Sequence, residues 1–459
     1  MAYGLAQSCH SLRNQRNAVR QARAKRGAFA WSLGALLSMA LLSSSAGAAP
    51  VTTPDRVEPT PIALTPEVAL EQLKRENLLL ESARHDLAAT RADVITAGLI
   101  PNPRLFVGGT WLMHGTPSGG HQEYQLGAEQ ELPVTGLAGV RRDAARATLT
   151  AAELEYATLG WELIFQMRSA YLDLELAQEQ LHLAQAALSD LEHARAIIEI
   201  RAKSGANPTY DLLRLGIERS RRVATVAEAT SAVLQKRVAL AHSIGPSVAA
   251  ATVSVTARIE MPTRPRLTGD ELVRHALRQR PEIAAARSRV VASELKTRAL
   301  SRQYVPSPQL SLGYARWAGV PTDQGNRDGG ALMAGISLPV PIFDHGQGTV
   351  DRSRAETLAA SSRRTQAEVM VRRQTEGAER QLTLRLDAWQ AFIENTPAEA
   401  DRMRQVAETA YREGRATILE LLDAYNAHFS VQELGLTLRA EALRAAAVLE
   451  WAIGPNSAL

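Results

Sequence analysis

The side chains in this sequence that could do chemistry are few, and no complete catalytic set is among them. Met113, His114 and His121 lie close together and offer the thioether and imidazole ligands that bind soft metals. A polar loop is the preferred interpretation, so we predict no resident metal and leave open whether His114 and His121 contact one. Asp344 precedes His345 as in a catalytic pair, but no nucleophile accompanies them. We therefore predict that the protein is not an enzyme and uses no cofactor.

The composition fits a folded protein and argues against nucleic-acid binding. Of 459 residues, 45% are apolar and 22% are charged, which excludes wholesale disorder. The formal net charge of +4 is concentrated at the start of the chain, where residues 1–48 hold six basic residues and no acidic one. The remainder carries 46 basic and 48 acidic residues. Such a chain lacks the electrostatic attraction for phosphates, so we expect no nucleic-acid partner.

The first 48 residues have the pattern of a secretory signal peptide. A basic segment precedes the apolar run from Ala28 to Leu42, and small residues follow up to Ala48, where we predict cleavage. A retained anchor is the alternative, although about 15 apolar residues are short for a span that needs about 20. Residues 49–62, rich in proline and threonine, are expected to form a disordered lead-in. The lone Cys9 lies within the signal, so we expect no disulfide and no lipid anchor.

The rest of the chain is a tandem duplication with a period near 205 residues. Residues 99–111 and 304–317 both place Pro-x-Pro before a short alternating run that ends in tryptophan. Residues 64–77 resemble residues 267–280 in the same way. This period is too long for a solenoid, so one unit is copied once. The predicted division is repeat 1 at 63–262, repeat 2 at 263–454 and a tail at 455–459.

Each repeat is predicted to contain one helix, two strands and then two very long helices. Apolar or small residues recur about every 3.5 residues from Leu149 to Leu191, the spacing of a left-handed coiled coil. A core helix of a globular bundle is the alternative. A helix from about 143 to 203 would be about 90 Å long at 1.5 Å per residue. Its counterpart in repeat 2 is expected from about 351 to 414, with a kink or break at Pro397.

The four predicted strands alternate between apolar and polar residues, as membrane β-hairpins do. They span about 104–114 and 122–132 in repeat 1, and about 308–317 and 331–340 in repeat 2. Trp111 and Trp317 are candidates for an aromatic belt, and polar tips are expected from 115 to 121 and from 319 to 330. A soluble sandwich is the alternative, but it would need more strands. Four strands cannot close a barrel in lipid, so at least two copies must combine.

These features together resemble the outer-membrane efflux (TolC) family. The resemblance rests on the duplication, the Pro-x-Pro before each hairpin and the segment 411–424 (YREGRATILELLDA), and it covers about residues 64–454. The segment 338–348 (LPVPIFDHGQG) resembles the heavy-metal branch, the cobalt–zinc–cadmium and copper–silver efflux channels. The resemblance implies a mainly α-helical fold with a membrane β part. Three chains would form one twelve-stranded outer-membrane barrel on a periplasmic α-helical tunnel.

The same resemblance implies roles for residues near the turns between long helices. Glu420 and Asp423 match the family's periplasmic gate motif and would form two rings of three carboxylates, which favour cations. Asp211 of repeat 1 is a weaker gate candidate, and capping or salt-bridging a neighbouring helix is the alternative role for Asp423. Gly205 and Gly414 resemble the adaptor-docking tips, with an ordinary C-cap glycine as the alternative.

The function implied by the resemblance is passive export across the outer membrane. The expected partners are two further copies of the chain, a periplasmic adaptor protein, an inner-membrane pump of the RND type and outer-membrane lipid. Heavy-metal cations such as cobalt, zinc, cadmium, copper or silver are the expected cargo, and a multidrug duct is the alternative. A periplasmic adaptor is disfavoured because adaptors carry one helical hairpin. An envelope hydrolase is disfavoured because no nucleophile, base and oxyanion donor come together.

Overall fold

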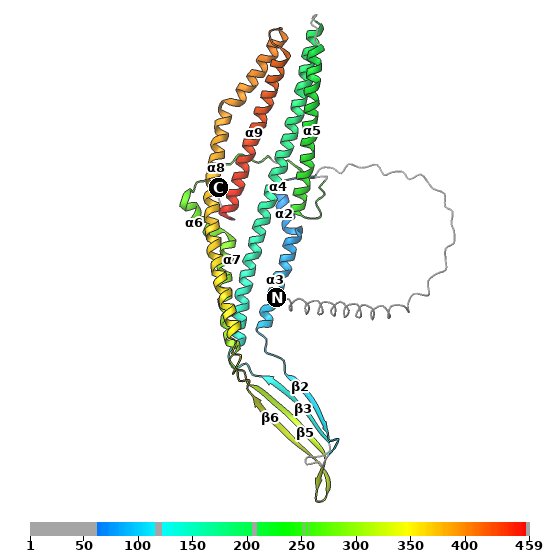
Figure 1. The fold of residues 1–459 in the computed structure, drawn as a ribbon, viewed down its shortest axis with the longest axis vertical. Coiled ribbons are helices and arrows are strands. Elements are labelled where there is room, and N and C mark those ends of the chain that lie inside the picture. Colours follow the sequence, from blue (N-terminus) through cyan, green and yellow to red (C-terminus); the bar gives the residue numbers. More distant parts are fainter. Residues whose placement is uncertain (1–61, 115–121, 204–208, 251–252, 257, 456–459) are drawn as a thin grey trace, which may run out of the picture. The chain divides into compact units, whose positions relative to one another are not determined.

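A computed structural model describes residues 62–114, 122–203, 209–250, 253–256 and 258–455. Its elements in chain order are β1 (Ile62–Leu64), α2 (Pro66–Glu76), α3 (Leu78–Ala97), β2 (Arg104–Trp111), β3 (Gln122–Glu131), α4 (Leu137–Lys203), α5 (Thr209–Ile244), β4 (Val253–Val255), α6 (Gly269–Gln279), α7 (Pro281–Gln303), β5 (Gln309–Thr322), β6 (Gly325–Ser337), α8 (Gln347–Arg412) and α9 (Ile418–Ile453). The same order of elements occurs twice, which is the duplication seen in the sequence (Figure 1). None of the described helices has a segment long and apolar enough to cross a membrane.

Each repeat begins with a short strand and two helices, where the sequence had predicted a single helix. β1 and β4 pair in parallel, with Ile62 opposite Val253. Ile62 therefore belongs to a strand and not to the expected lead-in, whose other residues lie outside the described part. Strands of three residues are too short to show a periodicity, which is why they were missed. The paired helices are separated by one extended residue, Asn77 in repeat 1 and Arg280 in repeat 2.

The second hairpin is longer than predicted at its tip and shorter at its base. β5 and β6 remain paired as far as Thr322 and Gly325, so most of the expected polar tip is strand. Gly325 has φ of 104°, a left-handed conformation that lets the chain reverse within two residues. β6 ends at Ser337 instead of 340, because Pro339 lacks the N–H that would continue the ladder. The tip of the first hairpin, 115–121, lies outside the described residues.

α8 continues through Pro397, so of the kink or break expected there the break is absent. Figure 1 shows that α8 changes direction in its orange part, and a proline inside a helix removes one backbone hydrogen bond and promotes such a bend. The helix packs on α7, α6 and α9, and these contacts hold the flanking turns in place.

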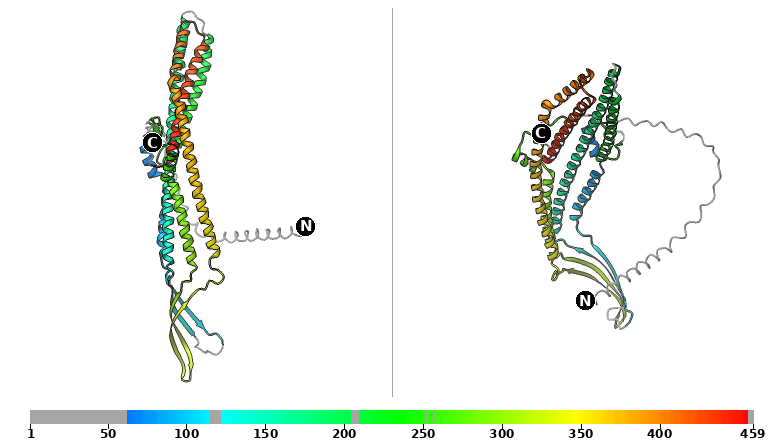
Figure 2. Two further views of the ribbon diagram at one scale, coloured as in Figure 1. Left: turned by 90° about the vertical axis from the view of Figure 1, so that its left-hand side faces the viewer. Right: turned by 45° about the horizontal axis from the view of Figure 1, so that its top comes forward.

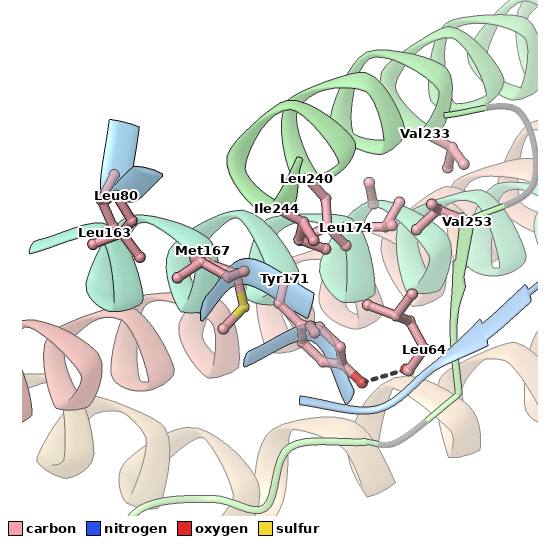
Figure 3. Packing of buried hydrophobic residues seen from close by; sticks show 13 residues of the cluster. Leu64, Leu80, Leu163, Met167, Tyr171, Leu174, Val233, Leu240, Ile244 and Val253 are labelled. Carbon is pink, nitrogen blue, oxygen red and sulfur yellow. Dashed lines mark hydrogen bonds between the residues drawn. The ribbon is translucent and has the colours of Figure 1, made fainter. Parts of the chain in front are cut away.

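Two long helices, α4 in repeat 1 and α8 in repeat 2, contact most of the other helices. α4 has 67 residues, about 100 Å of helix at 1.5 Å per residue. It packs on α3 and α7 in one half and on α5 and α9 in the other (Figures 1 and 2). One core lies where α2, α4 and α5 meet β1 and β4, and there the hydroxyl of Tyr171 donates to the carbonyl of Leu64 at 3.1 Å (Figure 3).

A buried ion pair joins the two repeats in this region. Arg439 of α9 donates to Glu175 of α4 at 2.9 Å, and both side chains are about 95% buried. Arg439 also donates to the carbonyl of Ile259 at 2.9 Å and pairs with Glu179. An unpaired buried charge destabilises the fold. Removing either Arg439 or Glu175 would therefore leave the other as an unfavourable buried charge.

Candidate functional site

The ends of four long helices, two from each repeat, share one apolar core. Its members come from the end of α4, the start of α5, the end of α8 and the start of α9: Leu191, Ala194, Ile197, Ile198, Leu215, Tyr411, Ile418, Leu421, Leu422 and Tyr425. We call this region the helix tips. Tyr411 and Tyr425 are the polar members of the core, and each hydroxyl needs a hydrogen-bond partner.

Tyr411 connects the helix tips of the two repeats. Its hydroxyl, on α8, donates to the Oδ2 atom of Asp211 in the first turn of α5, at 2.6 Å. The guanidinium carbon of Arg201, on α4, lies 4.7 Å from the centre of the Tyr411 ring. Tyr411 therefore makes a charge-assisted hydrogen bond and a cation–π contact, and both cross from repeat 2 to repeat 1.

The surroundings of Tyr411 keep its hydroxyl protonated. Burial, together with the hydrogen bond to the negatively charged Asp211, raises the pKa of Tyr411 to about 12. The hydrogen bond therefore has its donor at every pH near neutrality. Tyr425 is held in the same way, by burial and by a 2.7 Å hydrogen bond to Glu408, and its pKa is raised as well. That second bond joins α9 to α8 within repeat 2.

A second polar contact between the repeats lies further along the same helices. Arg222 of α5 donates to the side-chain oxygen of Asn426 on α9 at 2.5 Å. Its guanidinium carbon also lies 4.0 Å from the ring centre of Phe429. Two polar contacts therefore join the helix tips of the two repeats. One is made by Tyr411 of repeat 2 and the other by Arg222 of repeat 1.

The two gate candidates of α9 lie on its exposed side. Glu420 and Asp423 are three residues apart and exposed, while Leu421 and Leu422 between them are buried. Glu420 also completes a capping box, because its carboxylate accepts the backbone N–H of Thr417 at 2.6 Å. The hydrogen bonds from Thr417 lower the pKa of Glu420. Within the described residues Asp423 makes no hydrogen bond or ion pair, so it neither caps nor salt-bridges a neighbouring helix in this chain.

Gly414 ends α8 in the left-handed conformation, with φ of 78°. Its N–H donates to the carbonyl of Tyr411 at 3.0 Å, and the N–H of Arg415 donates to that of Ala410 at 2.8 Å. These bonds make Gly414 a C-cap glycine, the ordinary role left open for it. Gly205, its counterpart in repeat 1, lies outside the described residues, so the docking roles of both glycines remain predictions.

The residues that suggested other chemistry do not converge. Met113 is 85% exposed, His114 is exposed, and His121 lies outside the described residues. Asp344 accepts the backbone N–H of Gly346 at 2.9 Å, which makes it part of the turn before α8. In the described part of the chain no three His, Cys, Asp or Glu side chains are placed to hold a metal ion.

The four-stranded sheet has one apolar and one polar face. Its order is β2-β3-β5-β6, all antiparallel, so β2 and β6 are its edges. Residues directly opposite in the register share a face. The apolar face carries side chains that are 45% to 88% exposed: Leu105, Val107, Trp111, Tyr124, Leu126, Leu312, Tyr314, Leu332 and Ile336. The polar face carries Arg104, Glu123, Gln125, Glu129, Glu131 and Ser311. An exposed apolar face of this extent indicates contact with lipid or protein.

The two belt candidates lie on opposite faces of the sheet. Trp111 is opposite Gln122 on the apolar face and packs edge-on against Tyr124, with ring centres 6.1 Å apart. Trp317 is opposite Glu123 on the polar face. The Pro-x-Pro motifs of the repeats are 205 residues apart but the tryptophans 206, and one residue reverses the face of a strand. The two cannot share one belt.

Sequence reasoning named Asp211 as a gate candidate, but it did not single out Tyr411 or Arg201 and did not pair them with Asp211. Tyr411 lies within the segment that carried the resemblance, but Asp211 and Arg201 are about 200 positions away. No periodicity within one helix identifies a partner on another. The one available signal was the duplication, which places the tip of repeat 1 beside that of repeat 2.

Comparisons with known proteins give a consistent result. The family model described as outer membrane efflux protein matches residues 69–246 and 272–455. The cobalt-zinc-cadmium resistance protein CzcC of Cupriavidus metallidurans is 24% identical over 397 residues, 85% of this chain and 90% of CzcC. The pyoverdine export outer membrane protein OpmQ of Pseudomonas putida is 26% identical over 340 residues, 72% of this chain and 69% of OpmQ. The solved outer-membrane channel OprN superimposes with a TM-score of 0.70 at 22% identity, covering 85% of this chain and 89% of OprN.

Proposed function

Because this chain belongs to the outer membrane efflux protein family, we propose that it is the outer-membrane duct through which a tripartite system exports heavy-metal cations. The family and the TolC-like fold expected from the sequence are confirmed, and the family is one of channels, not enzymes. The location that follows is the outer membrane, with the helices extending into the periplasm. Passive conduction leaves the energy to an inner-membrane pump of the RND type, reached through a periplasmic adaptor.

The observation that carries the metal cargo is the match to CzcC over nearly the whole chain. The exposed pair Glu420 and Asp423 supports it, because carboxylates at a pore mouth concentrate cations. Both residues follow the turn at the helix tips, the end that would face an adaptor and a pump.

The proposed assembly is a homotrimer, because further copies must close the sheet. β2 and β6 have unpaired edges in the isolated chain, and unpaired backbone groups are not tolerated in lipid. Three copies give twelve strands, enough for a barrel with an open lumen. The polar face would then line the lumen, and the apolar face with Trp111 would contact lipid.

The helix tips would form the gate. The hydrogen bond from Tyr411 to Asp211 and the contact of Arg222 with Asn426 hold the tip of repeat 2 against that of repeat 1. Outward movement of α8 and α9 must break both contacts. In the tied state, Glu420 and Asp423 from three copies would narrow the pore, and the Gly414 turn would be free to meet an adaptor.

The test of the cargo is growth of a deletion strain on graded cobalt, zinc, cadmium, copper and silver salts, beside hydrophobic drugs and dyes. We expect sensitisation to metals that is reversed by the wild-type gene. The double variant Glu420→Gln/Asp423→Asn, which keeps the side-chain sizes, should restore metal resistance only in part. Sensitisation to drugs alone would contradict the metal assignment and leave the duct in place.

A siderophore duct is the second candidate, because OpmQ matches 72% of this chain and is named for pyoverdine export. It predicts retention of a secreted iron chelator in the deletion strain, with unchanged metal tolerance. Chelator assays on the culture medium distinguish the two cargoes.

That the protein carries no lipid anchor stays a prediction. Labelling cells with a radioactive fatty acid would check it.

A further inference from the structure

The duplication contains information about how neighbouring copies join. Inside one chain, β3 of repeat 1 pairs with β5 of repeat 2. In a closed ring of repeats, β6 of one chain meets β2 of the next. Here too the second strand of one hairpin pairs with the first strand of the following hairpin. The contact seen within the chain is therefore a template for the contact between chains, and this inference rests on the proposed barrel.

The two repeats can be aligned strand by strand at two independent points. The Pro-x-Pro motifs place Pro103 and Pro308 in equivalent positions, an offset of 205 residues from β2 to β5. A tight turn after each hairpin, in which Val134 N–H donates to Leu132 O and Ile342 N–H donates to Val340 O, gives an offset of 208 residues from β3 to β6.

The hairpin registers test both offsets. In the first hairpin Arg104 is opposite Glu129, and in the second Gln309 is opposite Ser337. Adding 205 to the first residue and 208 to the second converts one pair into the other. The two offsets were obtained without the registers, so the agreement shows that the hairpins are equivalent residue by residue.

We propose that β6 of each chain pairs with β2 of a second copy in one register, with Ile336 opposite Val107 and Leu338 opposite Leu105. Within the chain, Ala128 is opposite Leu312, and the offsets convert this pair into Ile336 and Val107. Gln130 opposite Leu310 becomes Leu338 opposite Leu105 by the same rule.

The register extends to the base of the sheet. The N–H of Leu132 donates to the carbonyl of Pro308 at 2.8 Å within the chain. Its counterpart between chains is a bond from Val340 N–H to the carbonyl of Pro103 in the next copy. The two segments adjoin the edge strands β2 and β6, and among the described residues no hydrogen bond uses the N–H of Val340 or the carbonyl of Pro103.

The side chains support this register, although they were not used to derive it. Ile336 and Val107 are 76% and 80% exposed in the single chain, and both belong to the apolar face. A register shifted by one residue would move the apolar face of β6 against the other face of β2, which carries Arg104. The same rule sets Leu332 opposite Trp111, two further members of the apolar face. The contact is heterologous, β6 to β2, and so closes a ring instead of a two-fold dimer.

Paired cysteines test the register in outer membranes. In a Cys9→Ser background, Val107→Cys/Ile336→Cys should form disulfides between copies under mild oxidation, because opposed residues have Cβ atoms about 4.5–5.5 Å apart and a small shift brings them to the roughly 3.5–4.5 Å of a disulfide. The product is a covalent trimer on a non-reducing denaturing gel. The matched control Leu105→Cys/Ile336→Cys is displaced by two residues, about 7–8 Å on the diagonal, and should stay monomeric. Phe106→Cys/Ser337→Cys repeats the test on the polar face.

The outcomes separate the register from the function. A covalent trimer from the two opposed pairs and not from the displaced pair supports the proposal. A trimer from the displaced pair alone, or none from any pair in a protein that remains trimeric, overturns it. Metal resistance of the reduced variants is scored separately. If the variants confer metal resistance but the expected disulfide does not form, the register alone is rejected. If the disulfide forms but deletion of the gene does not change metal resistance, the cargo alone is rejected.

Discussion

Replacing Tyr411 by phenylalanine removes the hydrogen bond between the repeats and little else. The ring stays in the apolar core of the helix tips, and the cation–π contact with Arg201 is kept. The carboxylate of Asp211 loses the hydroxyl that now lies at 2.6 Å. We expect Tyr411→Phe to raise the fraction of time that the channel is open.

The size of the effect follows from the type of bond and its burial. A hydrogen bond to a charged acceptor stabilises by about 1.5–3 kcal/mol, and its full loss would favour the open state by about ten- to a hundredfold. Asp211 is only half-buried, so water replaces part of the lost bond. We therefore expect the lower end, about a tenfold rise in the ratio of open to closed channels.

Single-channel recording in planar bilayers measures this ratio. Tyr425→Phe is the matched control, because it removes a 2.7 Å hydrogen bond to Glu408 that lies within repeat 2. It should change stability without changing gating. If Tyr425→Phe opens the channel as much as Tyr411→Phe, or if Tyr411→Phe conducts like wild type, the cross-repeat bond is not the tie that holds the tips.

The same bond predicts how gating responds to pH. The pKa of Tyr411 is raised from 10 to about 12 in the folded protein, so its contribution is fully present below pH 10 and is lost as pH rises toward 12. Open probability should be insensitive to this group between pH 6 and 9 and should rise above pH 10. Tyr411→Phe should lack that alkaline rise, and recordings at stepped pH would show it.

Three further predictions concern the charge at the tips, the buried ion pair and the barrel surface. Asp423→Asn should lower cation over anion selectivity, measured as a shift of reversal potential in a salt gradient; an unchanged potential would place Asp423 outside the pore. Arg439→Met leaves Glu175 buried and unpaired, so it should destabilise the fold by about 3–5 kcal/mol, measured as a lower thermal midpoint of the purified trimer. Brominated lipids should quench fluorescence from Trp111 and not from Trp317, compared by replacing each with phenylalanine; equal quenching would contradict the assignment of faces.

Local patterns in the sequence were enough to predict the long helices, the four strands of the sheet and their order along the chain. The 3.5-residue spacing from Leu149 to Leu191 predicted the long helix that the structure shows as α4. Alternation predicted the four strands of the sheet, and the duplication predicted that the elements occur twice. These properties depend on neighbours within a few residues, or on copying of the chain, and both are visible in one dimension.

The sequence could not place partners on different helices, nor could it determine which face a residue occupies when an insertion lies between repeats. Tyr411 belongs to the segment that carried the resemblance, but the sequence did not reveal its hydrogen bond to Asp211. That bond exists because the helix tips of the two repeats pack together. Trp317 looked equivalent to Trp111 until the register placed it on the opposite face. Periodicity and duplication therefore determined the parts of this protein, while the tertiary structure alone decided which side chains meet, because contacts across 200 residues depend on helix packing and strand register.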